Sequence, residues 1–221
     1  MPGFDTVLSF FAISVLLALS PGPDNLFVLA LSAAQGRAAG MRVVIGLCIG
    51  LVGHTLAVAA GLAAMFAASP AAFTALKLAG AGYLLWLAWL SLRPRQADGP
   101  APASRASPAT PPPRRRQRLV RRGIIMNLTN PKVSLFFLAL LPQFTSPQHG
   151  PVVTQILWLG VIFMLATLLV FGLIAWFAGL LGERLQRSPR IHRLMQRLAG
   201  LVFIGLALKL AFSPSLGAET V

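Results

Sequence analysis

Long apolar runs, separated by short polar or basic stretches, divide this chain into six segments. A helix of roughly 20 predominantly apolar residues crosses a bilayer, and each run is close to that length or longer. The predicted spans cover residues 4–32, 40–68, 71–92, 121–141, 152–181 and 196–213. The pattern therefore predicts an all-α membrane protein with six transmembrane helices.

The first predicted span is interrupted near its middle. Pro21 and Pro23 carry no amide hydrogen, so two helical hydrogen bonds are lost there. Gly22 precedes a proline and is pushed away from the helical region. Asp24 follows at once, and a carboxyl group at membrane depth is costly unless it is packed against protein or lines a wet cavity. The sequence predicts a broken helix with Asp24 and its polar neighbour Asn25 at the start of the second half.

The fourth predicted span has a break of its own. Pro131 removes the hydrogen-bond donor that the carbonyl of Asn127 would have in a continuous helix. Asn130 precedes this proline, and Lys132 follows it near the centre of the span. A pair of interrupted helices at corresponding positions of two halves is typical of secondary transporters, which bind their substrates at such breaks.

Composition and charge agree with a membrane protein. The chain is 56% hydrophobic and only 11% charged, which excludes an ordinary soluble domain. A net charge of +14 would suggest nucleic-acid binding in a soluble protein, but here the arginines gather in loops that alternate with uncharged loops. The positive-inside rule places the basic loops in the cytoplasm and both termini outside.

Three spans followed by three spans give the halves opposite orientations. The sequence KLAGAGY at 77–83 and RLAGLVF at 197–203 match at related positions. We therefore predict two inverted three-helix repeats, 1–92 and 121–221, with helices 1 and 4 broken. The connecting segment 93–120 is rich in Pro and Arg and is predicted to be a disordered cytoplasmic loop.

Two charged residues of the breaks are candidates for chemistry. The helix dipole at the start of a half-helix favours the ionised form of Asp24, whereas burial favours the protonated form, and the sequence does not decide between them. Lys132 is a cation at a half-helix N-terminus, where the dipole disfavours it. It needs an anion, for which Asp24 and a substrate carboxylate are both candidates, unless its side chain extends to the membrane interface.

The remaining candidates are polar but uncharged. Asn127 and Asn130 lie at the same depth, where they are suited to capping the broken helix ends or to contacting substrate. His54, in the middle of the second span, is either a proton relay or a neutral, hydrogen-bonded core residue. The sequence contains no metal-ligand cluster, phosphate-binding loop or nucleophile elbow, so no cofactor or metal is predicted.

Several of these motifs together resemble the lysine exporter family, which includes the homoserine/threonine-resistance branch. They are Ser-Pro-Gly-Pro at 20–23, the glycines of the second span, Lys-Leu-Ala-Gly-Ala-Gly-Tyr-Leu at 77–84, Gly123 to Asn127, Asn-Pro-Lys at 130–132 and Pro-Gln-Phe at 142–144. The resemblance covers nearly the whole chain except the 93–118 loop and the extreme tail. It implies a multi-pass exporter of amino acids or close derivatives in the bacterial inner membrane, driven by the proton gradient.

The leading hypothesis is thus a secondary transporter that exports amino acids by proton antiport. Its substrate and proton site would comprise Pro21, Gly22, Pro23, Asp24, Asn25, His54, Asn127, Asn130, Pro131 and Lys132. The alternatives are a membrane-embedded enzyme that uses Asp24 and His54 as acid and base, and a channel-like protein. The arginines of 93–122 suit anionic lipid head groups rather than nucleic acid, since aromatic residues for base stacking are absent there. Homo-oligomerisation is left open.

Overall fold

The structure is a computed structural model, and its described residues are helical or form short connections. They comprise 3–20, 22–68, 70–92, 113–187, 196–197, 200–201, 203–205, 207–208 and 211–212. Within these ranges there is no strand, in agreement with the all-α prediction.

The helices follow the predicted apolar runs. They are α1 (Phe4–Leu19), α2 (Pro23–Gln35), α3 (Arg37–Ala68), α4 (Pro70–Leu92), α5 (Pro113–Leu128), α6 (Pro131–Leu140) and α7 (Val152–Arg187), with short 3₁₀ turns η1 (Leu141–Phe144) and η2 (Pro147–His149) before α7. The described positions between 196 and 212 are helical as well, where the sixth span is predicted.

The predicted break in the first span is confirmed. Helix α1 ends at Leu19, α2 begins at Pro23, and the two are bent by 64°. Gly22 is extended, with φ −145° and ψ 176°, and Pro23 occupies the first helical position, where a missing amide hydrogen costs nothing. Pro21 lies outside the described residues.

The fourth span is broken as well, between α5 and α6. Asn130 is extended and caps α6, which begins at Pro131. With 10 residues, α6 is about 15 Å long, roughly half the hydrocarbon thickness of a bilayer.

The start of the fourth span differs most from the prediction. Helix α5 begins at Pro113, not at 121, so residues 113–120 of the segment expected to be disordered are helical. The reason is local, since proline suits the first position of a helix and the Arg, Gln and Leu that follow are good helix formers. Residues 93–112 lie outside the described part of the chain.

Two described helices have the length and hydropathy of membrane spans on their own, over Arg37–Gly61 of α3 and Val152–Ala178 of α7. The bent pair α1 and α2 qualifies when it is counted as one span, which makes three. Helix α3 has large apolar residues on its outer side as well as its inner side. Ile45, Ile49 and Leu56 are exposed, whereas Leu47 and Leu51 are buried. A helix that is apolar all round is typical of a lipid environment.

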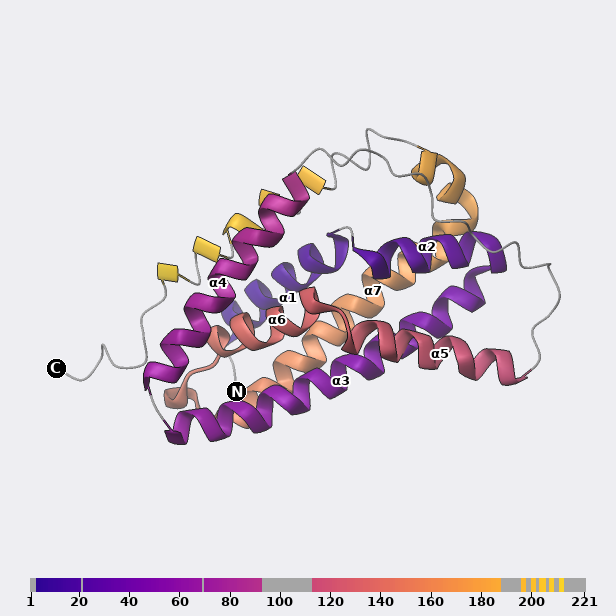
Figure 1. Cartoon of the computed structure of the whole chain (residues 1–221). Coiled ribbons are helices and arrows are strands. Elements are labelled where there is room, and N and C mark those ends of the chain that lie inside the picture. Colours follow the sequence, from indigo (N-terminus) through magenta and orange to yellow (C-terminus); the bar gives the residue numbers. More distant parts are fainter. Residues whose placement is uncertain are drawn as a thin grey trace.

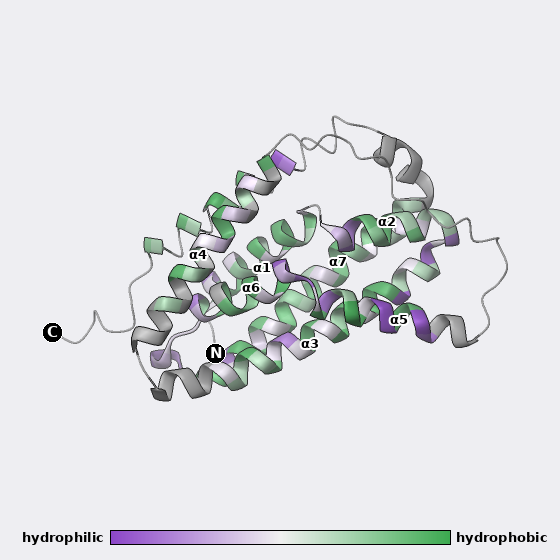
Figure 2. Ribbon diagram, viewed as in Figure 1, coloured by the Kyte–Doolittle hydropathy of each residue, from purple (hydrophilic) through white to green (hydrophobic). Residues whose placement is uncertain are grey.

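The two long helices organise the packing. Helices α3 and α7 pack against each other, α5 packs against α3, and α1 and α2 pack against α7, while α6 packs against α4 (Figure 1). Two apolar clusters result. One is centred on Phe10, Phe136 and Phe163, and the other includes Leu47 and Phe171. Figure 2 shows hydrophilic residues at the helix breaks and in the basic part of α5, while the long helices are mainly hydrophobic.

Glycines allow α3 and α5 to touch through their backbones. A Cβ atom on Gly46 would lie 2.9 Å from the Cα atom of Gly123 and closer still to the carbonyl oxygen of Val120. One turn further along α3, a Cβ on Gly50 would lie 2.7 Å from the Cβ of Asn127. This small-residue contact fixes how far α5 can approach, and so sets the position of the second break.

We expect Gly46→Ala to destabilise the protein by about 1–3 kcal/mol, because the added methyl group meets backbone that cannot move aside easily. Gly61→Ala in the same helix is the matched control. Nothing lies within 4 Å of a Cβ at Gly61, so this change should be neutral or mildly stabilising. Thermal unfolding of both variants in detergent measures the difference. Equal unfolding temperatures would contradict the close contact.

Candidate functional site

The two half-helices α2 and α6 begin in the same way. Each has an extended N-cap residue, a proline at the first helical position and a charged residue at the second. In α2 the charged residue is Asp24, and in α6 it is Lys132. The free amides of a helix N-terminus favour a carboxylate and disfavour an ammonium. Asp24 is therefore well placed with respect to its own helix, whereas Lys132 depends on a partner from elsewhere.

Asn130 connects the two half-helices. Its side-chain amide donates a hydrogen bond of 2.7 Å from Nδ2 to Oδ2 of Asp24. Its Oδ1 accepts a hydrogen bond of 3.0 Å from the backbone amide of Lys132, which is the N-cap interaction of α6. The capping role predicted for Asn130 is thus confirmed, and the same side chain also binds the carboxyl group of the other break.

Lys132 forms a second hydrogen bond between the two breaks. Its Nζ donates a hydrogen bond of 2.9 Å to the carbonyl oxygen of Ser20, the residue that caps the end of α1. A helix C-terminus favours a cation, so the end of α1 stabilises the ammonium group that the N-terminus of α6 disfavours. From the sequence, Asp24 and a substrate carboxylate were the predicted candidates for the partner of Lys132. Within the described residues the ammonium binds this carbonyl instead, with Asp24 in the same cavity.

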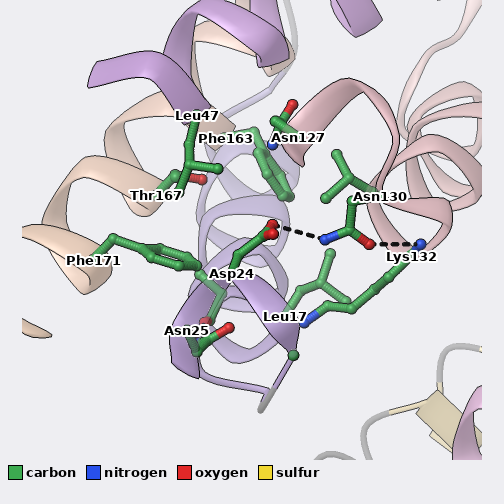
Figure 3. Close-up of a pocket in the computed structure, with 13 residues that line it drawn as sticks. Leu17, Asp24, Asn25, Leu47, Asn127, Asn130, Lys132, Phe163, Thr167 and Phe171 are labelled. Carbon is green, nitrogen blue, oxygen red and sulfur yellow. Dashed lines mark hydrogen bonds between the residues drawn. The ribbon is translucent and has the colours of Figure 1, made fainter. Parts of the chain in front are cut away.

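A small cavity lies between the two breaks, where the two apolar clusters meet (Figure 3). Its volume of about 20 Å³ is enough for a water molecule but not for an amino acid. The residues that line it are Leu17, Ala18, Gly22, Asp24, Asn25, Leu47, Asn127, Asn130, Lys132, Val133, Phe163, Thr167 and Phe171. The cavity thus brings together a carboxyl group, an ammonium group and three amides inside an apolar wall.

Most of the predicted site residues meet at this cavity. Asp24, Asn127 and Asn130 are each at most 5% exposed. Asn25 lines the cavity and also donates a hydrogen bond of 2.7 Å from Nδ2 to the carbonyl of Ala18, which ties α2 back to α1. Pro23 and Pro131 contribute by starting the half-helices.

His54 is placed differently from the other candidates. It is not among the residues that line this cavity. Its Nε2 lies 3.2 Å from the carbonyl oxygen of Asn127, at the end of α5, and its ring packs 5.7 Å from that of Phe137. His54 therefore supports the broken end of α5, which matches the hydrogen-bonded core alternative better than a direct relay at Asp24.

One wall of the cavity was not predicted from the sequence. Phe163, Thr167 and Phe171 of α7 follow one another at intervals of one helical turn and face the half-helices. The four-residue spacing marks one face of a helix, but many faces of α7 carry similar spacing. Which face turns inward depends on how the helix rotates against α2 and α3, and this is a tertiary property.

The fold and site define a helical membrane protein with a polar cavity between two broken helices. A family model described as LysE type translocator matches residues 15–213, and the chain belongs to this family. The family consists of translocators and not of enzymes. The alternative of a membrane enzyme with Asp24 and His54 as acid and base is therefore wrong, and the separation of His54 from the cavity agrees.

Curated relatives extend over most of the chain. A membrane protein of Vibrio cholerae, described as uncharacterized, is 34% identical and covers 92% of this chain and 95% of its own length. The homoserine/homoserine lactone efflux protein of Salmonella typhimurium is 38% identical, covering 72% of this chain and 73% of its own. The leucine efflux protein of an Enterobacter strain is 28% identical, covering 93% and 96%. No solved structure shows a significant match to this chain.

Replacing Asn130 by Ala should destabilise the protein by about 2–4 kcal/mol. The change removes the cap of α6, worth about 1 kcal/mol, and leaves the buried carboxyl group of Asp24 without its donor. Thr129→Ala is the neighbouring control, because Thr129 is exposed and, within the described residues, its hydroxyl donates only to the α5 carbonyls of Ile125 and Met126. Chemical denaturation compares the two, and an Asn130→Ala protein as stable as Thr129→Ala would show that Asn130 does not hold the breaks together.

Proposed function

We propose that this protein is a secondary transporter that exports amino acids or close derivatives from the cytoplasm in exchange for protons. The observation that carries the proposal is the shared cavity lined by Asp24 and Lys132, in which Asn130 donates to the carboxyl group of Asp24 and the ammonium group of Lys132 donates to the carbonyl of Ser20. Membership of the translocator family supports it, as do relatives named as homoserine and leucine efflux proteins.

The cavity matches the chemistry that all amino acids share. A zwitterion presents an ammonium and a carboxylate a few ångströms apart. Asp24 accepts the ammonium, while Lys132 and the free amides of the half-helices bind the carboxylate. In doing so, the substrate takes over the two bonds that link the breaks, replacing Asn130 at Asp24 and the Ser20 carbonyl at Lys132.

Substrate binding then has a structural consequence. Because the cavity of about 20 Å³ is too small for an amino acid, the half-helices must move apart to admit one. A ligand shifts a conformational equilibrium only through contacts that differ between the two states. Exchange of the bonds of Asn130 and Lys132 for bonds to the substrate supplies that difference.

Proton coupling follows from competition at Asp24. On the outer side, a proton from the acidic medium neutralises the carboxylate and releases the substrate ammonium. The proton leaves on the inner side, and the ionised carboxylate regains its affinity for the next substrate. Export is thereby driven by the proton gradient and needs no other energy source.

The proposed architecture is six spans in two inverted repeats, 1–92 and 121–221. The matching starts of α2 and α6 support it, since each has an N-cap, a proline and a charged residue in the same order. The packing supports it too. In the two repeats α3 corresponds to α7, and α5 corresponds to α1. The contact of α3 with α5 therefore has its counterpart in the contact of α7 with α1, and α3 and α7 also pack against each other.

The proposed orientation places both termini outside and the basic loops in the cytoplasm. Helices α3 and α5 begin on the same side of the bundle (right in Figure 1), and both carry arginines there. Arg37 stacks 4.3 Å from the ring centre of Trp176, and Arg122 stacks 4.2 Å from that of Phe27. Exposed arginines beside apolar helices suit anionic lipid head groups of the cytoplasmic leaflet.

Asp24→Asn should abolish gradient-driven export while the protein remains folded, because the amide keeps the shape but neither binds a proton nor attracts an ammonium. The control is Asp5→Asn, which changes an exposed aspartate at the start of α1. Amino-acid transport into proteoliposomes, with and without an imposed proton gradient, measures both variants. Gradient-driven transport by Asp24→Asn at the wild-type rate would reject Asp24 as the coupling residue.

The orientation predicts opposite labelling of two glutamines. In a Cys48→Ser background, Gln148→Cys in η2 should react with a membrane-impermeant maleimide in intact cells, because the proposed orientation puts η2 outside. Gln117→Cys, on the first turns of α5, should react only after the cells are opened. The reverse pattern would overturn the proposed topology.

A further inference from the structure

The cavity has two chemically different sides. The half-helices carry the groups suited to the ammonium and carboxylate that every amino acid has in common. The opposite side belongs to α7, where Phe163 and Phe171 lie one helical turn on either side of Thr167 (Figure 3). A substrate held by its zwitterion at the half-helices would direct its side chain towards α7. This wall is therefore the part of the cavity that such a side chain would meet.

Thr167 is the polar group of this wall. Its side chain is 4% exposed and its hydroxyl faces the cavity (Figure 3). A threonine in a helix commonly donates its hydroxyl to the carbonyl one turn earlier, as Thr55 does to Leu51 at 2.8 Å in α3. Among the described residues Thr167 forms no such bond, so its hydroxyl is available to a molecule in the cavity.

Burial makes the pairing of this hydroxyl matter for ligand affinity. A polar group that is withdrawn from water contributes affinity when a ligand pairs with it and opposes a ligand that leaves it unpaired. A site that hydrogen-bonds a substrate hydroxyl therefore discriminates against the analogue that lacks one. The two phenylalanines make the rest of this wall apolar, so the hydroxyl is the polar group that a side chain would meet there.

We infer that Thr167 is a specificity-determining residue, which selects amino acids with a short polar side chain over aliphatic ones of the same size. The inference rests on the proposed function, since it takes the cavity to be the amino-acid site. It goes further in two respects. It proposes that the substrate's side chain contacts α7, and that the hydroxyl group of Thr167 determines which amino acids the protein prefers.

L-Homoserine and L-norvaline provide the test, because they differ only in a terminal hydroxyl in place of a methyl group. Their affinities for the purified, reconstituted protein are compared by competition in a counterflow assay. We expect wild type to prefer homoserine, and Thr167→Val to reduce the ratio of the two affinities about fivefold, mainly by weakening homoserine. Thr167→Ser keeps the hydroxyl and should keep the preference.

The control is Thr154→Val, the same substitution at an exposed position near the start of α7, which should leave the ratio unchanged. Thr167→Val with an unchanged ratio, or with both affinities reduced equally, would overturn the inference while leaving the amino-acid site in place. A wild-type preference for norvaline would overturn it as well. If wild type bound neither these nor any other amino acid, the proposed function itself would fail, and the inference with it.

Discussion

The structure depends on how two broken helices compensate each other. A break in a membrane helix leaves backbone groups without partners, and a charged residue beside the break has no water to solvate it. Neither break resolves this problem alone. Asn130 of the second break binds Asp24 of the first, and Lys132 of the second binds the Ser20 carbonyl at the end of α1. The two costly features therefore stabilise each other only when they are brought together.

The rest of the fold keeps the breaks in contact. Glycines 46 and 123 let α3 and α5 touch through their backbones, and Gly50 leaves the space that Asn127 occupies. Helix α7 closes the other side by packing against both α1 and α2. The apolar core is consequently divided into two clusters with the polar cavity at their junction.

Local chemistry explains which parts of this arrangement could be predicted from sequence. The prolines and the charged residues beside them revealed both breaks, and the preference of Asn for helix starts identified the cap at Asn130. Other parts depend on tertiary geometry. The partner of Lys132 is a backbone carbonyl, which no side-chain pattern records. The placement of Thr167 inside the cavity and of His54 outside it depends on the rotation of α7 and α3, and both helices are too uniformly apolar to reveal an inner face.

The central claim is that the bond between Asp24 and Asn130 closes an amino-acid site. Solid-state NMR of protein in lipid bilayers tests it directly, by following the coupling between the carboxyl carbon of Asp24 and the side-chain amide nitrogen of Asn130. With these atoms joined through a hydrogen bond of 2.7 Å, the account predicts a clear correlation in the absence of amino acid. The correlation should be lost when a transported amino acid saturates the protein and its ammonium takes the place of the amide. A correlation that is absent from the start, or that persists unchanged at saturation, would contradict the account.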